Sequence, residues 1–426
     1  MHCIEGLTRF LEASPTAFHA VENIKAMLLE AGFTPLDEFA PWTLQPGGYF
    51  LTRNSSSILA FRVPEGKAEH FQIVASHADS PCFKLKPNYA RVQQGYAVLN
   101  VEKYGGMLMQ SWFDRPLSVA GRVIVRTDRG YATKLVNVNR DVALIPNVPI
   151  HFNREANDGV KLNPQVDMLP VIGAEGADVL ALIAEDLGVN VNAFAAHDLF
   201  LVNRDLPRVW GVRGEYIASP RLDDLECAYT SMEAFLRAAP SKHVDVLCVF
   251  DNEEVGSGTK QGADSTMLLD ALSRVAAATG MDAKRAVAKS FLVSADNAHA
   301  VHPNHPEKYD AENRATMNGG VVIKFNAAQK YTSDGLSQAV FEGVCERADV
   351  PVQRFANRSD IAGGSTLGHI AVTHASMNAV DIGLAQLAMH SANESAGVKD
   401  VDYMVRALKT FHETEIDVSE GEIALR

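Results

Sequence analysis

The sequence has few cysteines and no arrangement of them that would build a disulfide framework. It contains five, which are odd in number, widely separated and never spaced as Cys-x-x-Cys: Cys3, Cys82, Cys227, Cys248 and Cys345. Disulfide frameworks are typical of secreted domains, and closely spaced cysteines are typical of thiolate zinc sites. The cysteines support neither, and we expect the protein to work in a reducing cytoplasm.

Positive charge and long apolar runs are also scarce. The chain carries 39 Lys and Arg against 52 Asp and Glu, a net charge of −13, with no run of basic residues. Because a nucleic-acid-binding surface is normally basic, we expect no nucleic-acid partner. No segment has the apolar length that crosses a bilayer, and the first residues lack the pattern of a secretory signal. We expect a soluble, unprocessed chain whose partners are small molecules or other protein chains.

Apolar residues are nonetheless plentiful, and they occur as short runs that break into polar residues. Four such runs are HFQIVASH, VDVLCVFDNEE, KSFLVSADNAH and HASMNAVDIG. Helical patterns lie between several of them, so the sequence predicts an α/β domain with a largely parallel sheet buried on both faces. Functional groups of such sheets gather at the carboxyl ends of the strands.

The chain is long enough for two domains, or for one domain with an insertion. Between about 89 and 219 the pattern changes to short alternating stretches that indicate antiparallel strands. We therefore expect an inserted, mainly β domain at 89–219, which splits an α/β domain into 1–88 and 220–426. Near the start, a helix is predicted over 14–33, with Ser14 as its cap and Gly32 as its stop.

Histidines and carboxylates follow the apolar runs. A lone histidine at a strand end is more often a simple hydrogen-bonded residue, and an aspartate before a helix is often a cap. Here several such groups are expected at one edge of one sheet. They are His77 and Asp79 in SHADSP, Asp223 and Asp224 in SPRLDDL, Glu253 and Glu254 in DNEE, Asp296 in SADNAH, and His390 in AMHSANE.

Nitrogen and oxygen ligands without thiolates suit a divalent ion such as zinc, cobalt or manganese. Shared carboxylates suit a pair of ions, which lie about 3.5–4 Å apart in two-metal hydrolases. A further carboxylate beside the ions can accept a proton from the attacking water. Glu253 and Glu254 can divide these tasks, one as ligand and one as base.

Five motifs in this order resemble the aspartyl aminopeptidase family of metallopeptidases: SHADSP, SPRLDDL, DNEEVGSGT, SADNAHAVHPNHPEKY and MHSANE. The resemblance runs nearly end to end and includes SPTAFHAV and YGGMLMQSWFDRPLSVAGRV. It implies a zinc-peptidase fold with two divalent ions, most often zinc. The first ion would be held by His77, Asp223 and Asp296, and the second by Asp223, Glu254 and His390, with Asp223 bridging.

The resemblance also implies roles beside the metals. Glu253 would be the general base, Asp79 would orient His77, and Asp224 is left as a structural residue. The family forms dimer-based homo-oligomers, up to a dodecamer, in which the inserted domain makes much of the dimer contact. A histidine of that domain reaches the partner's active site, and the matching segment LIPNVPIHFNR makes it His151.

An acidic substrate side chain needs a local cation. By resemblance, Lys324 and Tyr331 in VVIKFNAAQKYTSDG line the specificity pocket, although a solvated lysine is the ordinary alternative. The segment SDIAGGSTLGHI departs from the animal members of the family, so a broader or neutral preference stays open. The spacing of three further histidines suits ligands, but prolines interrupt the segment and structural or substrate-side roles are favoured: His299, His302 and His305.

Two other functions are compatible with the metal ligands. A deacylase or carboxypeptidase would use the same centre on a different substrate terminus. A non-catalytic assembly protein on this fold is disfavoured, because every expected ligand and Glu253 are retained.

Overall fold

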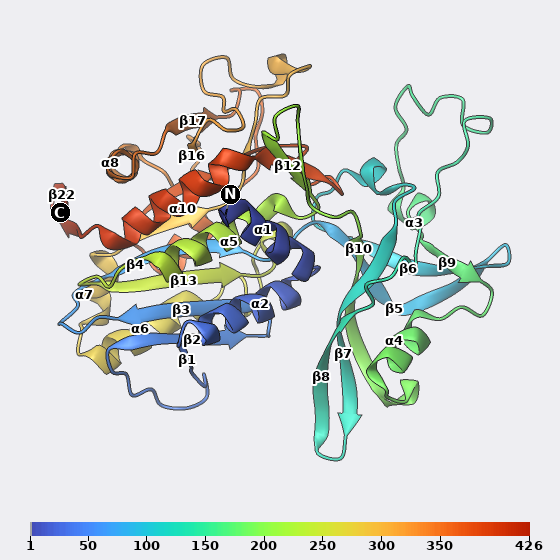
Figure 1. Cartoon of the computed structure of the whole chain (residues 1–426), viewed down its shortest axis with the longest axis horizontal. Helices are drawn as coiled ribbons and strands as arrows, with labels where there is room; N and C mark the ends of the chain where they lie inside the picture. Colours follow the sequence, from blue (N-terminus) through green and yellow to red (C-terminus); the bar gives the residue numbers. More distant parts are fainter. Residues whose placement is uncertain (1) are drawn as a thin grey trace.

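The computed structural model describes residues 2–426 and contains a helix-flanked sheet with a second, mainly β part beside it (Figure 1). The larger sheet has nine strands, in the order β1 (Thr34–Pro35), β2 (Gly47–Arg53), β3 (Ser57–Val63), β13 (Val244–Phe250), β4 (Phe71–His77), β14 (Phe291–Ala295), β18 (Asn378–Gly383), β16 (Val321–Phe325) and β17 (Val352–Ala356). The four central strands, β13 to β18, are parallel, and antiparallel neighbours border them on both sides. The predicted α/β fold with a largely parallel mixed sheet is confirmed.

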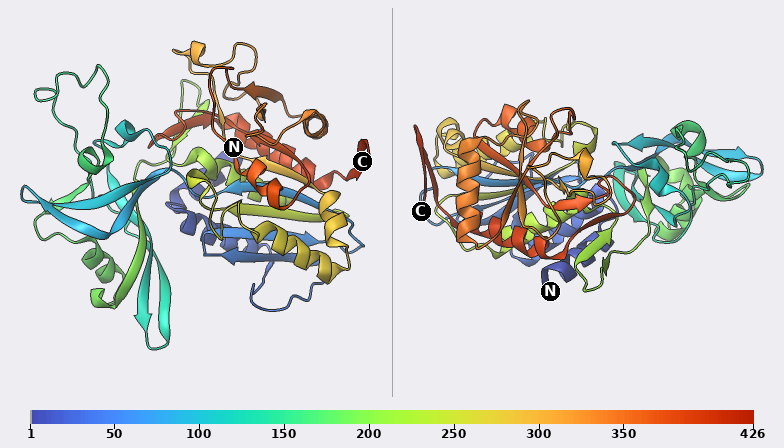
Figure 2. Two further views of the ribbon diagram at one scale, coloured as in Figure 1. Left: turned by 180° about the vertical axis from the view of Figure 1, so that it is seen from behind. Right: turned by 90° about the horizontal axis from the view of Figure 1, so that it is seen from above.

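Helices cover both faces of this sheet (Figure 2). One face packs against α1 (His2–Ala13), α2 (Ala17–Glu30), α5 (Leu222–Arg237), α8 (Gly335–Arg347) and α10 (Val398–Glu413). The other packs against α6 (Met267–Thr279), α7 (Ala283–Ala288) and α9 (Leu367–His374). Successive side chains of a strand point to opposite faces, so Val74 joins the first core while Ile73 and Ala75 join the second. This double burial explains why the central strands are continuously apolar.

The cap predicted for the first long helix is wrong by two residues. Helix α2 begins after Thr16, whose hydroxyl lies 2.8 Å from Nδ1 of His19. Ser14 is instead buried, and its hydroxyl accepts a hydrogen bond from Asn23. Gly32 follows the helix with a φ of +82°, as expected of a residue that ends a helix.

The second part is a six-stranded antiparallel sheet in the order β8 (Gly130–Asn137), β7 (Leu117–Thr127), β10 (Phe194–Asn203), β5 (Cys82–Gln93), β6 (Tyr96–Tyr104) and β9 (Val171–Ala174). Two helices accompany it, α3 (Pro164–Asp167) and α4 (Val179–Leu187), and it has its own apolar core. Strand β5 begins five residues after β4 ends. The short SHADSP segment therefore joins the two sheets.

A five-stranded sheet contributes further segments near this junction. Its order is β11 (Arg208–Trp210), β12 (Tyr216–Ser219), β20 (Glu394–Gly397), β19 (Ala385–Leu387) and β15 (Ala298–His299). A hairpin of β21 (Ile416–Ser419) and β22 (Glu422–Leu425) ends the chain. Of the helices within 2–426, none combines the length and the apolar character needed to span a membrane.

Candidate metal centre

Histidines and carboxylates meet at the carboxyl ends of β4, β13 and β14, three adjacent strands of the large sheet. Helix α5 adds Asp223 in its first turn, and the loop between β19 and β20 adds His390. The potential ligand atoms lie within 4.8 Å of one another in three overlapping groups: His77, Asp223, Asp224 and Asp296; Asp223, Glu254 and His390; and His77, Glu253 and Glu254. The structure thus brings together all five residues that were predicted as ligands, with Glu253 beside them.

Asp223 belongs to two of these groups, and its two oxygens face different histidines. Oδ1 lies 3.6 Å from Nε2 of His77, and Oδ2 lies 3.3 Å from Nε2 of His390. The same nitrogen of His390 is 3.4 Å from Oε2 of Glu254. The side chain of Asp223 therefore lies between two sets of donors.

Unpaired polar atoms in the cluster indicate that its residues can hold a divalent cation. Four buried atoms in the cluster have no hydrogen-bond partner within residues 2–426: His77 Nε2, Asp223 Oδ1, Asp224 Oδ1 and Glu254 Oε1. Buried polar atoms are normally paired, because an unpaired one keeps its full desolvation penalty. Histidine nitrogens and carboxylate oxygens are also zinc ligands.

The charges of the cluster also favour a bound cation. Burial and the negative charge of Asp223 raise the pKa of Glu254 well above its usual range. Burial and the surrounding carboxylates, Asp296 foremost, raise the pKa of Glu253 to about 8, against the opposing effect of His77. Hydrogen bonds from His390 and His77 outweigh burial at Asp223 and lower its pKa. Crowded carboxylates of this kind are stabilised by a bound cation.

Asp79 ties the segment after β4 to the loop after β13. Its Oδ1 and Oδ2 accept hydrogen bonds from the backbone N–H groups of Glu253 and Glu254, both at 3.1 Å. Nδ1 of His77 lies 3.1 Å from the carbonyl oxygen of Asp79 and 3.3 Å from its Oδ1. One aspartate therefore contacts a histidine of the cluster and fixes the backbone of both glutamates.

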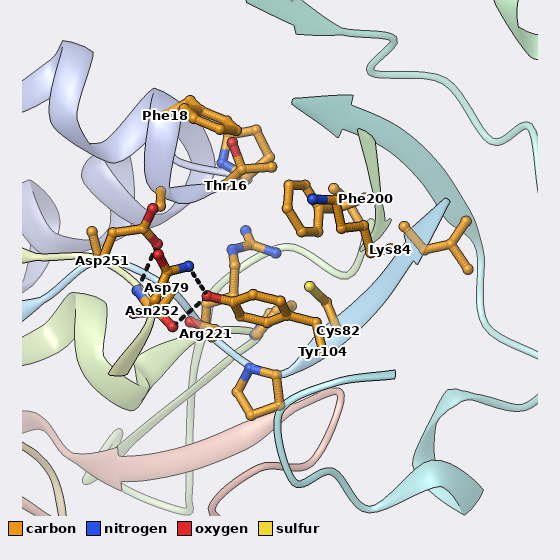
Figure 3. Close-up of a pocket in the computed structure, with 18 of the residues that line it drawn as sticks. Thr16, Phe18, Asp79, Cys82, Lys84, Tyr104, Phe200, Arg221, Asp251 and Asn252 are labelled. Atoms are coloured by element: carbon orange, nitrogen blue, oxygen red, sulfur yellow. Dashed lines mark hydrogen bonds between the residues drawn. The ribbon is translucent and has the colours of Figure 1, made fainter. Parts of the chain in front are cut away.

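Tyr104, the last residue of β6, supports Asp79 from the inserted sheet (Figure 3). Its hydroxyl donates to Oδ2 of Asp79 at 2.7 Å and accepts from Nδ2 of Asn252 at 2.8 Å. These residues border a cavity of about 290 Å³ at the junction of the sheets, where Phe18, Phe200 and Arg221 also lie. The inserted sheet thus contributes directly to the geometry of the cluster.

Two buried carboxylates accept hydrogen bonds from the backbone N–H groups of candidate ligands. Oδ2 of Asp224 accepts from the N–H of His77 at 3.0 Å, which agrees with the structural role left to it. Glu394 was missed: its oxygens accept from the N–H groups of Asp223 at 3.0 Å and His390 at 2.7 Å. Burial raises the pKa of Glu394 to about 8. Glu394 ends the MHSANE motif and Tyr104 begins YGGMLMQSWFDR, so motif membership was the available signal for both.

Lys324 is buried on β16 and points at the cluster. Its Nζ donates to the carbonyl oxygens of Asp296 at 2.9 Å and Asn297 at 3.3 Å, and it lies 3.7 Å from Oδ1 of Asp296. The ring of Tyr331, also buried, has its centroid 5.3 Å from the same Nζ. The ordinary alternative of a solvated lysine is wrong.

The other histidines singled out in the sequence belong to none of the ligand groups within 2–426. His151 is exposed on the loop between β8 and α3, and this loop projects away from the large sheet (Figure 1). None of the ligand groups found in 2–426 includes it. The same holds for three histidines of the segment after β14: His299, His302 and His305.

This α/β fold, with histidines and carboxylates gathered at the carboxyl ends of parallel strands, defines a metal-dependent hydrolase. The family model described as aminopeptidase I zinc metalloprotease (M18) matches residues 10–412. The chain belongs to this M18 family and is a zinc metalloaminopeptidase. It is 46% identical over 421 residues to a probable M18 family aminopeptidase 2 of Clostridium novyi (strain NT), covering 95% of this chain and 97% of the relative.

Solved structures of similar proteins support the same assignment. Ape4, in a cryo-EM structure of its complex with Nbr1, superposes with a TM-score of 0.93 and 35% identity, over 96% of this chain and 85% of Ape4. A dodecamer of S. cerevisiae mApe1 gives a TM-score of 0.83 and 25% identity, over 96% of this chain and 95% of the yeast chain. The resemblance inferred from the five motifs is therefore confirmed at the level of the family.

Proposed function

We propose that the protein is a co-catalytic two-metal aminopeptidase that removes N-terminal residues, preferentially Asp or Glu, from peptides. The observation that carries the two-metal assignment is the position of Asp223, whose oxygens face His77 and His390 in two separate ligand groups. One carboxylate shared between two sets of donors is typical of paired-ion hydrolases.

The proposed ligands are those of the two groups that share Asp223. One ion is assigned to His77, Asp223 and Asp296, and the other to Asp223, Glu254 and His390. Zinc is the ion of the family, and cobalt and manganese accept similar donors. When bound, such ions polarise the scissile carbonyl and lower the pKa of water toward neutral.

Glu253 is the proposed general base. A carboxylate with a pKa near the working pH can accept a proton from water and return it to the leaving amine. Glu253 lies in the ligand group with His77 and Glu254, and its backbone N–H is held by Asp79. Asp79 is proposed to position both Glu253 and His77.

Lys324 is the proposed source of the acidic preference, together with Tyr331. The buried side chain of Lys324 places a positive charge beside the cluster, in a protein whose net charge is −13. Two of its three N–H donors already point at carbonyl oxygens of Asp296 and Asn297, so selectivity would rest on charge more than on a free hydrogen bond. A broader or neutral preference is the alternative.

The active assembly is proposed to be a dimer-based homo-oligomer, with the dodecamer of yeast mApe1 as its model. We assign the dimer contact to the inserted domain at 89–219, and the catalytic domain to 1–88 and 220–426. Large apolar side chains are exposed around His151 in this insertion: Val148, Ile150 and Phe152. His151 would then stabilise the oxyanion in the partner's site. The cytoplasmic location stays a prediction.

The test is hydrolysis of five free aminoacyl substrates, Asp, Glu, Leu, Ala and Lys, after metal removal and after readdition of zinc, cobalt or manganese. We expect turnover to vanish with the metal, to return with zinc, and to be highest on Asp and Glu. Equal rates on all five would support the broader aminopeptidase. Metal-free protein as purified, with no turnover after metal is added, would favour the non-catalytic assembly protein.

A further inference from the structure

A second group of potential metal ligands lies at the opposite end of the central strands. His70 directly precedes β4, His243 directly precedes β13, and Glu415 follows α10. One ligand atom of each lies within 4.8 Å of the others. Because both strands have seven residues, roughly 20 Å separate this group from the metal centre at the carboxyl ends. The two groups are therefore independent sites.

The hydrogen bonds of His243 determine which of its nitrogens carries the hydrogen. Nε2 lies 3.0 Å from Oδ1 of Asp245 and 3.0 Å from the carbonyl oxygen of His412, and both of these atoms only accept. Nε2 is thus the N–H donor. The other nitrogen, Nδ1, faces Oε2 of Glu415 at 3.4 Å. In the neutral ring a lone pair would point at a carboxylate, so a positive charge is required between them.

A proton on His243 would not satisfy the buried nitrogen of His70. Its side chain is 7% exposed, and its Nε2 has no hydrogen-bond partner among the described residues. The nearest carboxylate oxygen, Oε1 of Glu415, is 3.9 Å away, too far for a hydrogen bond. A proton on Nδ1 of His243 would pair only His243 with Glu415, whereas a divalent cation would also engage Nε2 of His70.

We propose that His70, His243 and Glu415 bind a further zinc-type divalent cation at the amino ends of β4 and β13. Tetrahedral zinc holds its donors about 3.3 Å apart, close to the 3.4 and 3.9 Å from Glu415 to the two histidines. Asp245 accepts from the far nitrogen of His243, as carboxylates do behind metal-binding histidines. The side chain of Glu415 is 31% exposed, so solvent can complete the coordination.

Charges of both signs face the group. Asp245 and Glu415 favour a bound cation, whereas three positive side chains oppose one: Arg62, Lys242 and Lys289. Burial and the charge of His243 lower the pKa of His70, which keeps its nitrogen available as a ligand. Burial lowers the pKa of His243, but hydrogen bonds with Asp245 and Glu415 outweigh it and raise the pKa to about 9, so a metal ion must displace a proton from Nδ1. Nη1 of Arg62 lies 3.8 Å from Oδ2 of Asp245, so Arg62 partly balances the charge of the carboxylate behind His243.

The position of the group assigns it a structural role. Gln72 on β4 already contacts the carbonyl of Phe411 at 2.6 Å and the N–H of Ile416 at 3.1 Å. A cation on Glu415 would add a metal bond between the same segment and the start of β4. It would fasten the end of α10 and the terminal hairpin to the central sheet, and it would take no part in peptide hydrolysis.

Anomalous diffraction at the zinc edge, on crystals of the zinc-equilibrated oligomer, tests the proposal. We expect a peak between Nε2 of His70, Nδ1 of His243 and the carboxylate of Glu415, whatever the peaks at the carboxyl ends show. No density there, with an ordered Glu415, would leave a protonated His243 paired with Glu415 and would overturn the proposal.

Elemental analysis of two variants gives a second, crystal-free test. Glu415→Gln and His70→Gln should each hold one zinc per chain fewer than the wild type, unfold at a lower temperature in zinc, and keep hydrolysis within about twofold. Glu420→Gln, the same change at an exposed residue of the same hairpin, is the control and should match the wild type. Unchanged zinc content in both folded variants would contradict the proposed site.

Discussion

Among single residues, Asp223 and Glu253 belong to different ligand groups, and different roles are proposed for them. Asp223 lies between two histidines and belongs to two ligand groups, whereas Glu253 belongs only to the group with His77 and Glu254. A bridge affects how much metal is bound, while a base affects the rate with metal in place. Variants at the two positions should therefore fail in different ways.

Glu253→Gln should abolish turnover while both metals stay bound, because the amide keeps the shape of the side chain but cannot accept a proton. Loss of a general base typically costs about 10²–10⁴-fold in rate. The measurement is kcat together with zinc content. Retention of more than about a tenth of wild-type kcat would remove Glu253 from the proton transfer.

Asp223→Ala is the contrasting variant. It removes the one side chain that two ligand groups share, so we expect it to lose zinc from both positions as well as activity. Elemental analysis of the folded variant, beside Glu253→Gln, shows the difference. Full zinc occupancy without Asp223 would contradict the bridge.

Lys324→Met should lower kcat/KM on aspartyl substrates at least about tenfold more than on alanyl substrates. Loss of a buried charge partner costs about 2 kcal/mol or more, and only the acidic substrate has that partner. Lys330→Met, the same change at a partly exposed lysine nearby, is the control. Equal losses on both substrates would show that Lys324 supports Asp296, its hydrogen-bond partner, and has no part in selectivity.

The residues of the cluster could be predicted from the sequence because each lies in a recognisable motif, and most of them follow an apolar strand or begin a helix. Glu394 was not predicted although it ends the MHSANE motif, because its role is to accept backbone N–H groups of Asp223 and His390, and such contacts have no sequence pattern. Residue type alone predicts Ser14 as the cap. The chain instead starts the helix after Thr16, leaving Ser14 to pair with Asn23.

At the scale of elements, the centre depends on how neighbouring strands end. β4 and β13 are parallel and in register, so His77 pairs with Phe250 and the residues after Phe250 start level with the end of β4. Asp79 then joins the two ends. The parallel arrangement followed from the apolar runs, but the order of strands did not, because periodicity carries no information about which strands are neighbours.

Tyr104→Phe tests the support that β6 gives to this edge. The change removes the hydroxyl that donates to Asp79, and a hydrogen bond to a charged group contributes about 1.5–3 kcal/mol. We expect kcat to fall about tenfold or more, with zinc content unchanged. Tyr96→Phe, at the exposed start of the same strand, is the control. Wild-type kcat in Tyr104→Phe would mean that Asp79 needs no help from the inserted sheet.

In the whole molecule, the inserted sheet is covalently continuous with the centre, but none of the ligand groups found within 2–426 includes a residue of its long loop. The loop between β8 and α3 projects away from the large sheet, and His151 is on that loop (Figure 1). If His151 acts in catalysis, it must act on another subunit. This is a property of the assembly, which a single sequence indicates only through family resemblance.

Mixed oligomers test whether subunits share sites. His151→Ala and Glu253→Ala should each be nearly inactive, for lack of the oxyanion donor and of the base. Co-expressed with different tags and purified as doubly tagged species, they should regain part of the activity, because a subunit that keeps Glu253 can use His151 of its neighbour. Verified mixed dimers no more active than either parent would end the shared-site proposal.

The central claim is that this metal centre removes residues from a free N-terminus. The most direct measurement is mass spectrometry of a peptide with an N-terminal Asp, free or acetylated, incubated with zinc-loaded and with metal-depleted protein. We predict stepwise loss of residues from the free N-terminus with zinc, and an intact peptide in the other three mixtures. Cleavage of the acetylated peptide, release from the C-terminus, or undiminished hydrolysis after metal removal would contradict the account.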